Sequence, residues 1–177
     1  MIVSDEDPTA TAIRELIDKE AIRTVLAQFC RGVDRGDAEA LEGVYHPGAL
    51  ENHGDFIGSA ADWMRLALDV APQHFTVMHH SLGTSNIELN GEIATVETYF
   101  SAGCVLRAGT DGDSVATTIH GRYADRFERR DGDWRIANRV VVKDFREVRP
   151  ITDPDERYPM GRWGANDPVY EALGRSN

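Results

Sequence analysis

Two glycine turns inside a long strand-forming stretch constrain the fold of this chain more than any other feature. Strand-forming residues dominate four consecutive segments, 75–89, 92–107, 114–129 and 133–148. Asn90-Gly91 joins the first two and Asp131-Gly132 joins the last two. Such dipeptides between alternating runs are the strongest short-range hairpin signal. With a glycine-rich loop over 108–113 between the middle two, the segments are predicted to form a consecutive antiparallel meander.

The sequence before this meander is predicted to be helical. Apolar side chains recur at helical spacing over 11–33, opposite a charged side. They are Ile13, Leu16, Ile17, Ile22, Val25, Leu26, Phe29 and Val33. The stretch 31–37 breaks this helix, and Asp37 can cap a second one that runs to Val44. A short strand over 49–52 and a third helix over 59–70, ended before Pro72, are expected next.

Helices gathered before long strands indicate an α+β fold. We expect three N-terminal helices packed on the concave face of a strongly curved antiparallel sheet. The length of 177 residues corresponds to about one domain. After residue 150 the chain has no periodic elements, and its prolines alternate with Tyr158, Trp163 and Tyr170. We therefore expect a domain over 1–146 and a C-terminal strap or lid over 147–177.

The charge and the cysteine content exclude several classes of protein. The chain has 30 acidic and 19 basic residues, a formal net charge of −11, which disfavours nucleic acid and membranes as partners. No apolar stretch is long enough to span a bilayer, and the start of the chain lacks the cationic region of a secretory signal. Cys30 and Cys104 suit two reduced thiols rather than a disulfide framework, so a cytoplasmic location is expected.

Asp34 and the pair His79-His80 are the candidate chemical groups. Asp34 follows the first helix between two glycines. It is either a plain turn residue or a group at the open end of the helix–sheet sandwich. Adjacent strand residues point to opposite faces, so only one of the two histidines can face the core. Held by a carboxylate, that histidine is a general base near neutral pH; bonded to a carbonyl, it is structural.

No metal or cofactor site is predicted. The histidines show no metal-ligand spacing; they are His46, His53, His74, His79, His80 and His120. The glycine-rich segments lack the spacing of phosphate-binding and dinucleotide-binding loops, and no nucleophile elbow is present. We therefore expect chemistry that needs no cofactor.

Three separated segments resemble the SnoaL-like branch of the nuclear transport factor 2-like superfamily. They are 22–37 (IRTVLAQFCRGVDRGD), 80–91 (HSLGTSNIELNG) and 121–139 (GRYADRFERRDGDWRIANR). The resemblance spans 11–146 and implies a cone-shaped α+β barrel with a pocket between the helices and the sheet. The chain is similar to members that use an Asp-His dyad for dehydration or dehydrochlorination. That similarity places the dyad at Asp34 and His80, and a further catalytic arginine at Arg139.

The chain departs from those members at Phe29, where they carry the lysine or tyrosine that assists the leaving group. Arg139 also falls on the outer face by strict alternation from Trp134 and Ile136, unless a β-bulge shifts the strand. Help for a leaving oxygen or halide would come from Arg139 or from other polar groups, namely Tyr45, His53, Tyr99 and His120. The expected apolar pocket walls are Phe29, Val33, Trp63, Met78 and Tyr99.

These features predict a lyase acting on a small aromatic or polycyclic hydroxylated substrate. The reaction would be dehydration, or the retro-aldol-like loss of formaldehyde known for lignin-derived diaryl compounds in similar members. An isomerase or polyketide cyclase uses similar base chemistry, and a non-catalytic ligand-binding or assembly subunit can share the fold. The outer face and edges of an open curved sheet predict a homodimer or homotrimer.

Overall fold

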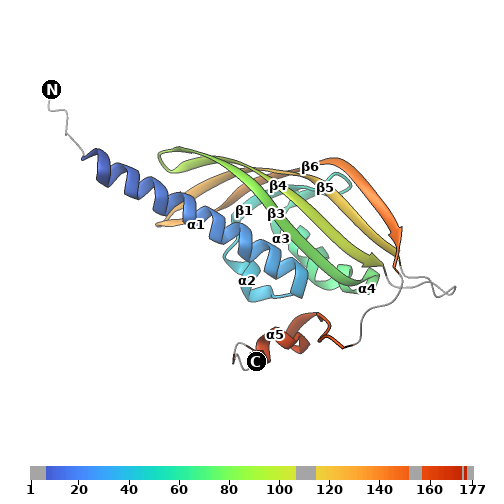
Figure 1. Cartoon of the computed structure of the whole chain (residues 1–177). Coiled ribbons are helices and arrows are strands. Elements are labelled where there is room, and N and C mark those ends of the chain that lie inside the picture. Colours follow the sequence, from blue (N-terminus) through green and yellow to red (C-terminus); the bar gives the residue numbers. More distant parts are fainter. Residues whose placement is uncertain (1–6, 107–114, 152–156, 173, 175–177) are drawn as a thin grey trace.

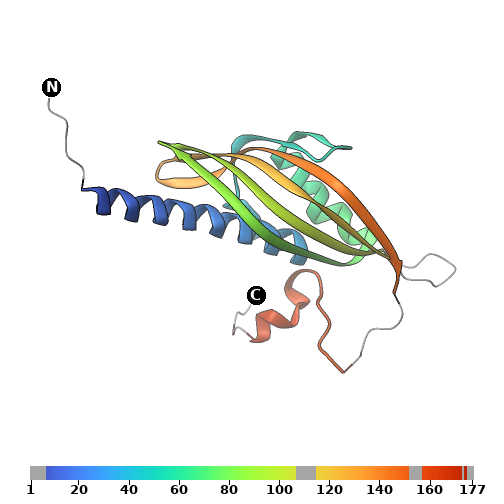
Figure 2. The same ribbon diagram turned by 45° about the horizontal axis from the view of Figure 1, so that its top comes forward.

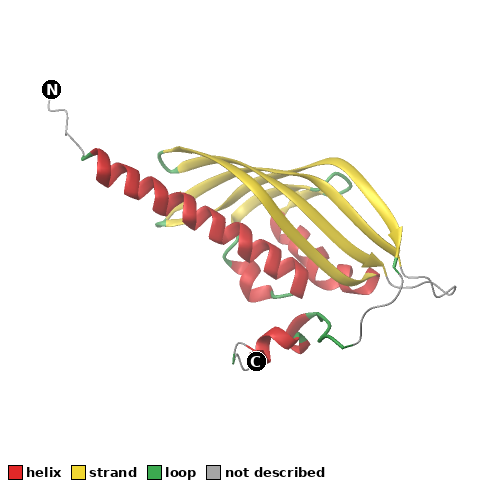
Figure 3. Cartoon of the chain, viewed as in Figure 1, coloured by secondary structure: helices red, strands yellow, loops and turns green. Residues whose placement is uncertain are grey.

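The computed structural model describes residues 7–106, 115–151, 157–172 and 174. Figure 1 and Figure 3 show two layers, with the helices lying along the inner side of one long curved sheet. In chain order the N-terminal elements are α1 (Pro8–Arg35), α2 (Ala38–Glu42), β1 (Tyr45–Asn52), β2 (Ile57–Ser59), α3 (Ala60–Arg65), the π-helix η1 (Leu66–Val70) and α4 (Ala71–His74). They are followed by β3 (Phe75–Asn90), β4 (Ile93–Leu106), β5 (Val115–Arg130), β6 (Asp133–Pro150), the 3-10 helix η2 (Gly164–Asn166) and α5 (Pro168–Ala172).

The six strands form one curved sheet that does not close on itself, in the order β2-β1-β6-β5-β4-β3. The last four strands are the predicted antiparallel meander. Asp131 and Gly132 both have positive φ angles, 54° and 91°, as a tight hairpin turn requires. β1 pairs in parallel with β6, because it enters the sheet from the helical layer and no hairpin turn sets its direction. The expected α+β architecture is confirmed.

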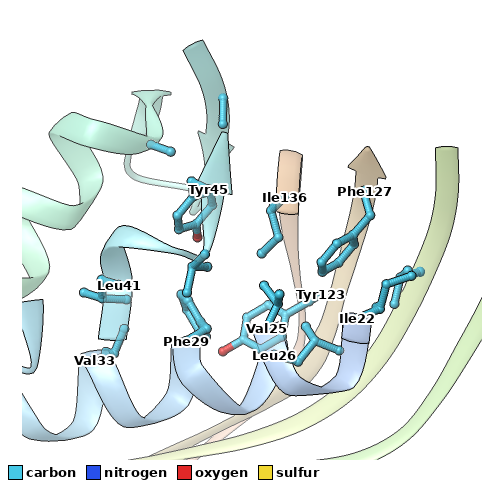
Figure 4. Packing of buried hydrophobic residues seen from close by; sticks show 14 of the residues in the cluster. Ile22, Val25, Leu26, Phe29, Val33, Leu41, Tyr45, Tyr123, Phe127 and Ile136 are labelled. Carbon is cyan, nitrogen blue, oxygen red and sulfur yellow. The ribbon is translucent and has the colours of Figure 1, made fainter. Parts of the chain in front are cut away.

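The core lies between α1 and the inner face of the sheet. Figure 4 shows Ile22, Val25, Leu26, Phe29 and Val33 of α1 pointing at aromatic and aliphatic side chains of β5, β6 and α2. Each such side chain, once fully buried, contributes about 1.5–3 kcal/mol to folding. This packing fixes the rotation of α1 about its axis, and therefore the direction in which residues of its last turn point.

The N-terminal half of α1 does not contribute to this core, contrary to the sequence-based expectation. Ile13, Leu16 and Ile17 are 51%, 66% and 62% exposed. Figures 1 and 2 show this end of the helix extending beyond the sheet. Asp18 joins this part of the helix to the sheet, accepting hydrogen bonds from Trp134 Nε1 (2.9 Å) and Arg129 Nη1 (3.0 Å). Helical periodicity predicted the element correctly, but the helix is longer than the sheet that covers it.

The third helix also continues further than predicted. Pro72 does not end it, because the preceding residues Leu66–Val70 form a π-helical turn. The Ala71 N–H donates to the Leu66 carbonyl, a wider spacing than in an α-helix. Such a widened turn accommodates a proline that would clash in a regular helix. Among the described helices, none is both long and apolar enough to span a membrane.

Candidate active site

A carboxylate and an imidazole meet where the C-terminal end of α1 covers the free edge of β3. Among the described strands β3 pairs only with β4, so every second N–H and C=O along its other edge has no strand partner there. Asp34 fills this gap: its Oδ2 accepts from the His80 N–H (2.7 Å), and its Oδ1 lies 2.6 Å from His80 Nδ1. The same carboxylate therefore protects the sheet edge and holds the imidazole.

The α-helix ends immediately after this carboxylate. Gly36 caps α1 with a left-handed backbone (φ 63°), and its N–H donates to the Gly32 carbonyl. Gly32 permits close packing on α2, because a Cβ there would lie 2.4 Å from Leu41 Cγ. Gly36 therefore ends the helix just after Asp34, and Gly32 lets this last turn pack closely on α2.

His80, rather than His79, points inward. His79 is exposed on the outer face near the Ser81 hydroxyl. The side chains of His80 and Asp34 are 7% and 9% exposed, and the Phe29 ring meets the His80 ring edge-on at 6.1 Å. Because an ionised carboxylate only accepts hydrogen bonds, Nδ1 of His80 is the donor in this contact with Asp34. The Asp34 carboxylate thus fixes the orientation of the imidazole.

Arg139 lies deeper, on the inner face of β6. The β5–β6 register shifts beside Ala137, and this bulge turns Arg139 inward opposite Asp125. Its guanidinium is fully buried, makes two 2.7 Å hydrogen bonds to Asp125, and lies between the Phe29 and Tyr123 rings at 4.2 and 4.1 Å. Burial opposes its charge, but Asp125, Tyr45 and Glu51 raise its pKa well above the ordinary value. Its Nη1 is buried and has no hydrogen-bond partner among the described residues.

A second buried chain of polar groups borders this arginine. The Tyr45 hydroxyl donates to Glu51 Oε2 (2.9 Å), and His53 Nδ1 lies 2.8 Å from Glu51 Oε1. His53 also stacks on Trp63, which stacks on Phe29 at 5.5 Å. Burial raises the pKa of Tyr45 well above its usual range. Phe29 thus contacts His80 of the dyad as well as Arg139 and Tyr45.

Comparison with known proteins identifies the family. The model of the SnoaL-like domain matches residues 14–140. The chain belongs to the SnoaL-like family of the nuclear transport factor 2-like superfamily. No curated protein sequence matches the chain significantly.

Solved structures with the same fold include the hexachlorocyclohexane dehydrochlorinase LinA-type3 from Novosphingobium barchaimii LL02, with a TM-score of 0.67, 16% identity and coverage of 81% of this chain and 96% of that one. A protein described as a putative scytalone dehydratase from Novosphingobium aromaticivorans has a TM-score of 0.63, 16% identity, and coverage of 79% and 91%. The Kfla4162 protein from Kribbella flavida has a TM-score of 0.68, 15% identity, and coverage of 75% and 95%. At these identities the neighbours show a shared fold.

Most of the expected lining residues of this SnoaL-like domain gather on the inner side. Phe29, Val33, Tyr45 and Trp63 are buried in the core cluster, and Met78 packs against it. His53 lies beside them through its stack on Trp63.

Tyr99 and His120 lie on the outer face of the sheet, away from the dyad. Tyr99 is 50% exposed and alternates with the inward-facing Phe100, and Arg122 covers its ring. His120 bonds Ser101 (2.9 Å) and stacks on Phe145. Strand alternation separates both side chains from the inner site.

Glu51 and Asp125 are buried acidic groups that the sequence reasoning did not single out. Both sit at inward positions of their strands, Glu51 two residues after Ala49 and Asp125 between Tyr123 and Phe127. Their burial could have been inferred from the sequence, because each acidic residue takes a place in its strand where the alternation calls for an apolar side chain.

The two thiols lie inside as well. Burial, and secondarily the charge of Asp34, raise the pKa of Cys30 to about 12 and that of Cys104 to about 11. At neutral pH both are therefore protonated and poor nucleophiles. Within the described ranges, no three His, Cys, Asp or Glu side chains are grouped to hold a metal ion.

Proposed function

We propose that the protein is a cofactor-independent lyase in which Asp34 and His80 act as a general-base dyad. The observation that carries this proposal is the two-point contact of Asp34 with the Nδ1 and the backbone N–H of His80. This contact sets both the tautomer and the orientation of the imidazole, and it leaves Nε2 to accept a proton. The fold shared with a dehydrochlorinase and a protein described as a dehydratase supports elimination chemistry.

The proposed substrate is a small hydroxylated aromatic or polycyclic compound. Aromatic side chains dominate the surroundings of the dyad: Phe29 contacts His80, and Trp63 and Tyr45 follow behind it. Rings of this kind bind flat apolar molecules by offset or edge-on packing. The surrounding apolar side chains also exclude water from the base, which strengthens its interaction with a bound group.

Two reactions use such a base. In dehydration, Nε2 of His80 takes a proton from carbon, the C–H electrons form a double bond, and the C–O bond breaks. The leaving hydroxide takes the proton from Nε2 and departs as water. In formaldehyde loss, Nε2 takes the hydroxyl proton of a CH2OH group, and the adjacent C–C bond breaks as the C=O bond of formaldehyde forms. The electrons of the broken bond pass to the carbon next to the aromatic ring, which then takes the proton back from Nε2. The second reaction suits this chain better, because Phe29 offers no acid to a leaving group at the position where similar enzymes have one.

In this proposal Arg139 stabilises the anion that forms during the reaction. It adds a permanent positive charge 4.2 Å from the centroid of the Phe29 ring, which itself contacts His80. One of its donors, Nη1, is not used by the described protein groups. A fixed charge in a dry environment stabilises a developing anion more strongly than the same charge in water.

The test is a comparison of His80→Ala and Asp34→Asn with wild type on a panel of hydroxylated aromatic compounds, including diaryl propanediols. Product absorbance reports dehydration, and released formaldehyde reports C–C cleavage. We expect either variant to lower the rate by about 10²–10⁴-fold, the usual contribution of a positioned general base. His79→Ala is the matched control, since its ring faces outward. A folded His80→Ala protein with full activity would rule out the dyad mechanism.

A non-catalytic binding or assembly role is the second candidate, and one observation favours it. Asp34 already satisfies the edge N–H of His80, so the pair has a structural use that needs no reaction. In that case both variants would lose stability, no compound of the panel would turn over in wild type, and ligand affinity would be the property that changes. A product that is an isomer of the substrate, formed without loss of water or formaldehyde, would instead indicate an isomerase or cyclase.

Assembly as a homodimer or homotrimer stays a prediction. Exposed Phe145 and Val148 on β6, and Tyr99 on β4, give the sheet apolar side chains that a second copy would cover. Light scattering at micromolar concentration tests this, and a monomer would contradict it.

A further inference from the structure

Arg35 joins three segments of the chain next to the dyad. Its Nη1 donates to the carbonyl of Asp34 (2.9 Å) and to that of Met78 (3.4 Å). Its Nε lies 3.6 Å from Oδ2 of Asp167, in the C-terminal segment. One guanidinium therefore contacts the end of α1, the free edge of β3 and the segment 157–172.

The contact with β3 is at the same edge that Asp34 holds. Within a strand, residues two apart present their N–H and C=O groups to the same side. The Met78 carbonyl and the His80 N–H accordingly face α1 together, and Arg35 and Asp34 bind them as neighbours. Two consecutive residues of α1 thus hold the edge strand: Asp34 binds it at His80, and Arg35 binds it at Met78.

Asp167 is built into the C-terminal segment rather than attached at its surface. It is 7% exposed, and it accepts the N–H of Arg162 (2.8 Å) and the N–H of Val169 (3.0 Å). Its position is therefore set by the backbone on both sides of η2. A carboxylate fixed in this way can hold Arg35 only while the whole segment is seated on α1.

Two further contacts seat the segment on the end of α1. The Tyr170 hydroxyl donates to Asp37 Oδ2 (3.0 Å), the same oxygen that accepts from Arg31 Nε (3.0 Å). The Trp163 ring lies against Gly36, where an added Cβ would be 3.2 Å from the ring. Figure 1 shows α5 beneath the C-terminal end of α1 and beside α2. The segment is thus anchored within a few residues of Asp34.

We propose that the C-terminal segment positions the catalytic dyad through Arg35. Arg35 is a positioning residue: it holds the Asp34 and Met78 carbonyls together, and Asp167 holds its guanidinium in place. If Asp167 is removed, the guanidinium is free to turn toward water, and β3 can separate from α1 at His80. The proposal rests on the proposed function, because it gives the segment a role in keeping the base oriented.

The experiment follows the hydrogen bond itself. A proton in the short Nδ1–H contact of His80 gives a far-downfield ¹H resonance, which ¹⁵N-histidine labelling identifies and which His80→Ala removes. We compare the full-length wild type with Arg35→Leu, Asp167→Asn and Glu171→Gln. The last variant is the matched control: Glu171 is an exposed carboxylate of α5, the helix that follows Asp167. Circular dichroism and melting confirm that each protein is folded.

We expect the resonance to be unchanged in Glu171→Gln. In Asp167→Asn and Arg35→Leu it should lose at least about half of its intensity, because its exchange with water follows local opening of the site. A resonance of full intensity in folded Asp167→Asn would overturn the proposal, even if Arg35→Leu fails to fold. A wild type without the resonance would overturn the dyad hydrogen bond and this proposal together. A resonance present in every variant would overturn the positioning role alone and leave the dyad standing.

Discussion

The two buried acid–base pairs of this protein, Asp34–His80 and Asp125–Arg139, differ in every property that matters for chemistry. The first lies at the free edge of the sheet, and its base is an imidazole that can gain and lose a proton. The second lies in the middle of the sheet, has no exposed surface, and contains a guanidinium that is always charged. The edge pair can move a proton, whereas the central pair supplies fixed charge.

This difference follows from the number of partners that each pair has. Asp125 binds Arg139 through both oxygens, and the Phe29 and Tyr123 rings enclose the guanidinium. Asp34 binds one ring nitrogen and one backbone N–H, and the second ring nitrogen of His80 makes no hydrogen bond within the part of the chain that the structure describes. A general base needs such an unused atom, and a structural ion pair does not.

The largest effect is expected from breaking the central pair. Asp125→Ala leaves Arg139 charged, buried and unpaired, which should lower the free energy of unfolding by about 3–5 kcal/mol. Urea unfolding followed by circular dichroism measures this. Asp133→Ala is the control, because its exposed pair with Arg135 should contribute no more than about 1 kcal/mol. Equal losses in the two variants would show that the central pair is not the fixed structural element described above.

Breaking the edge pair should cost less stability. Asp34→Ala leaves two donors of His80 without their acceptor, and neither is charged while the imidazole is neutral. The expected loss is about 1–3 kcal/mol in the same urea experiment. A loss as large as that of Asp125→Ala would show that the edge pair is mainly structural, and would favour the binding or assembly role.

The Cys30 thiol is a probe of both pairs, because its pKa responds to a charge from each of them. The charge of Asp34 raises the pKa of Cys30 and the charge of Arg139 lowers it, on top of the larger effect of burial. With a pKa of about 12 its thiolate population at pH 8 is about 10⁻⁴. Alkylation followed by mass spectrometry should therefore be very slow in the native protein. It should become faster in Asp34→Asn; an unchanged rate would mean that Asp34 is not charged beside this thiol.

The smallest effect is expected on the C-terminal segment when the pH is lowered. Burial opposes ionisation of Asp167, but the N–H groups of Arg162 and Val169 and the charge of Arg35 lower its pKa below the ordinary 3.8. A lowered carboxyl pKa stabilises the folded form above the unfolded value, and this contribution is lost as the pH falls through the lower folded value. We expect segment 157–172 to lose amide protection below about pH 4 while the sheet remains protected. Loss of protection in the segment and in the sheet at the same pH would contradict this.

Local sequence signals predicted the elements well. The Asn-Gly and Asp-Gly turns, the helical periodicity of α1 and the cap at Asp37 lie within a few residues of each element they define. The errors arose where length or context decided the outcome. The apolar residues near Ile13 continue a helical pattern beyond the sheet, and the helix after Ser59 passes Pro72 through a π-helical turn.

The sequence by itself determined the meander, the amphipathic helix and the inward direction of one histidine, because turn chemistry and side-chain alternation act over a few residues. Only the tertiary structure decided that Asp34 meets His80 at a sheet edge, that Arg139 is held by Asp125, and that Glu51 is buried. Those contacts join residues far apart in the chain. They depend on the curvature of the sheet, on one bulge in β6 and on the rotation that core packing imposes on α1.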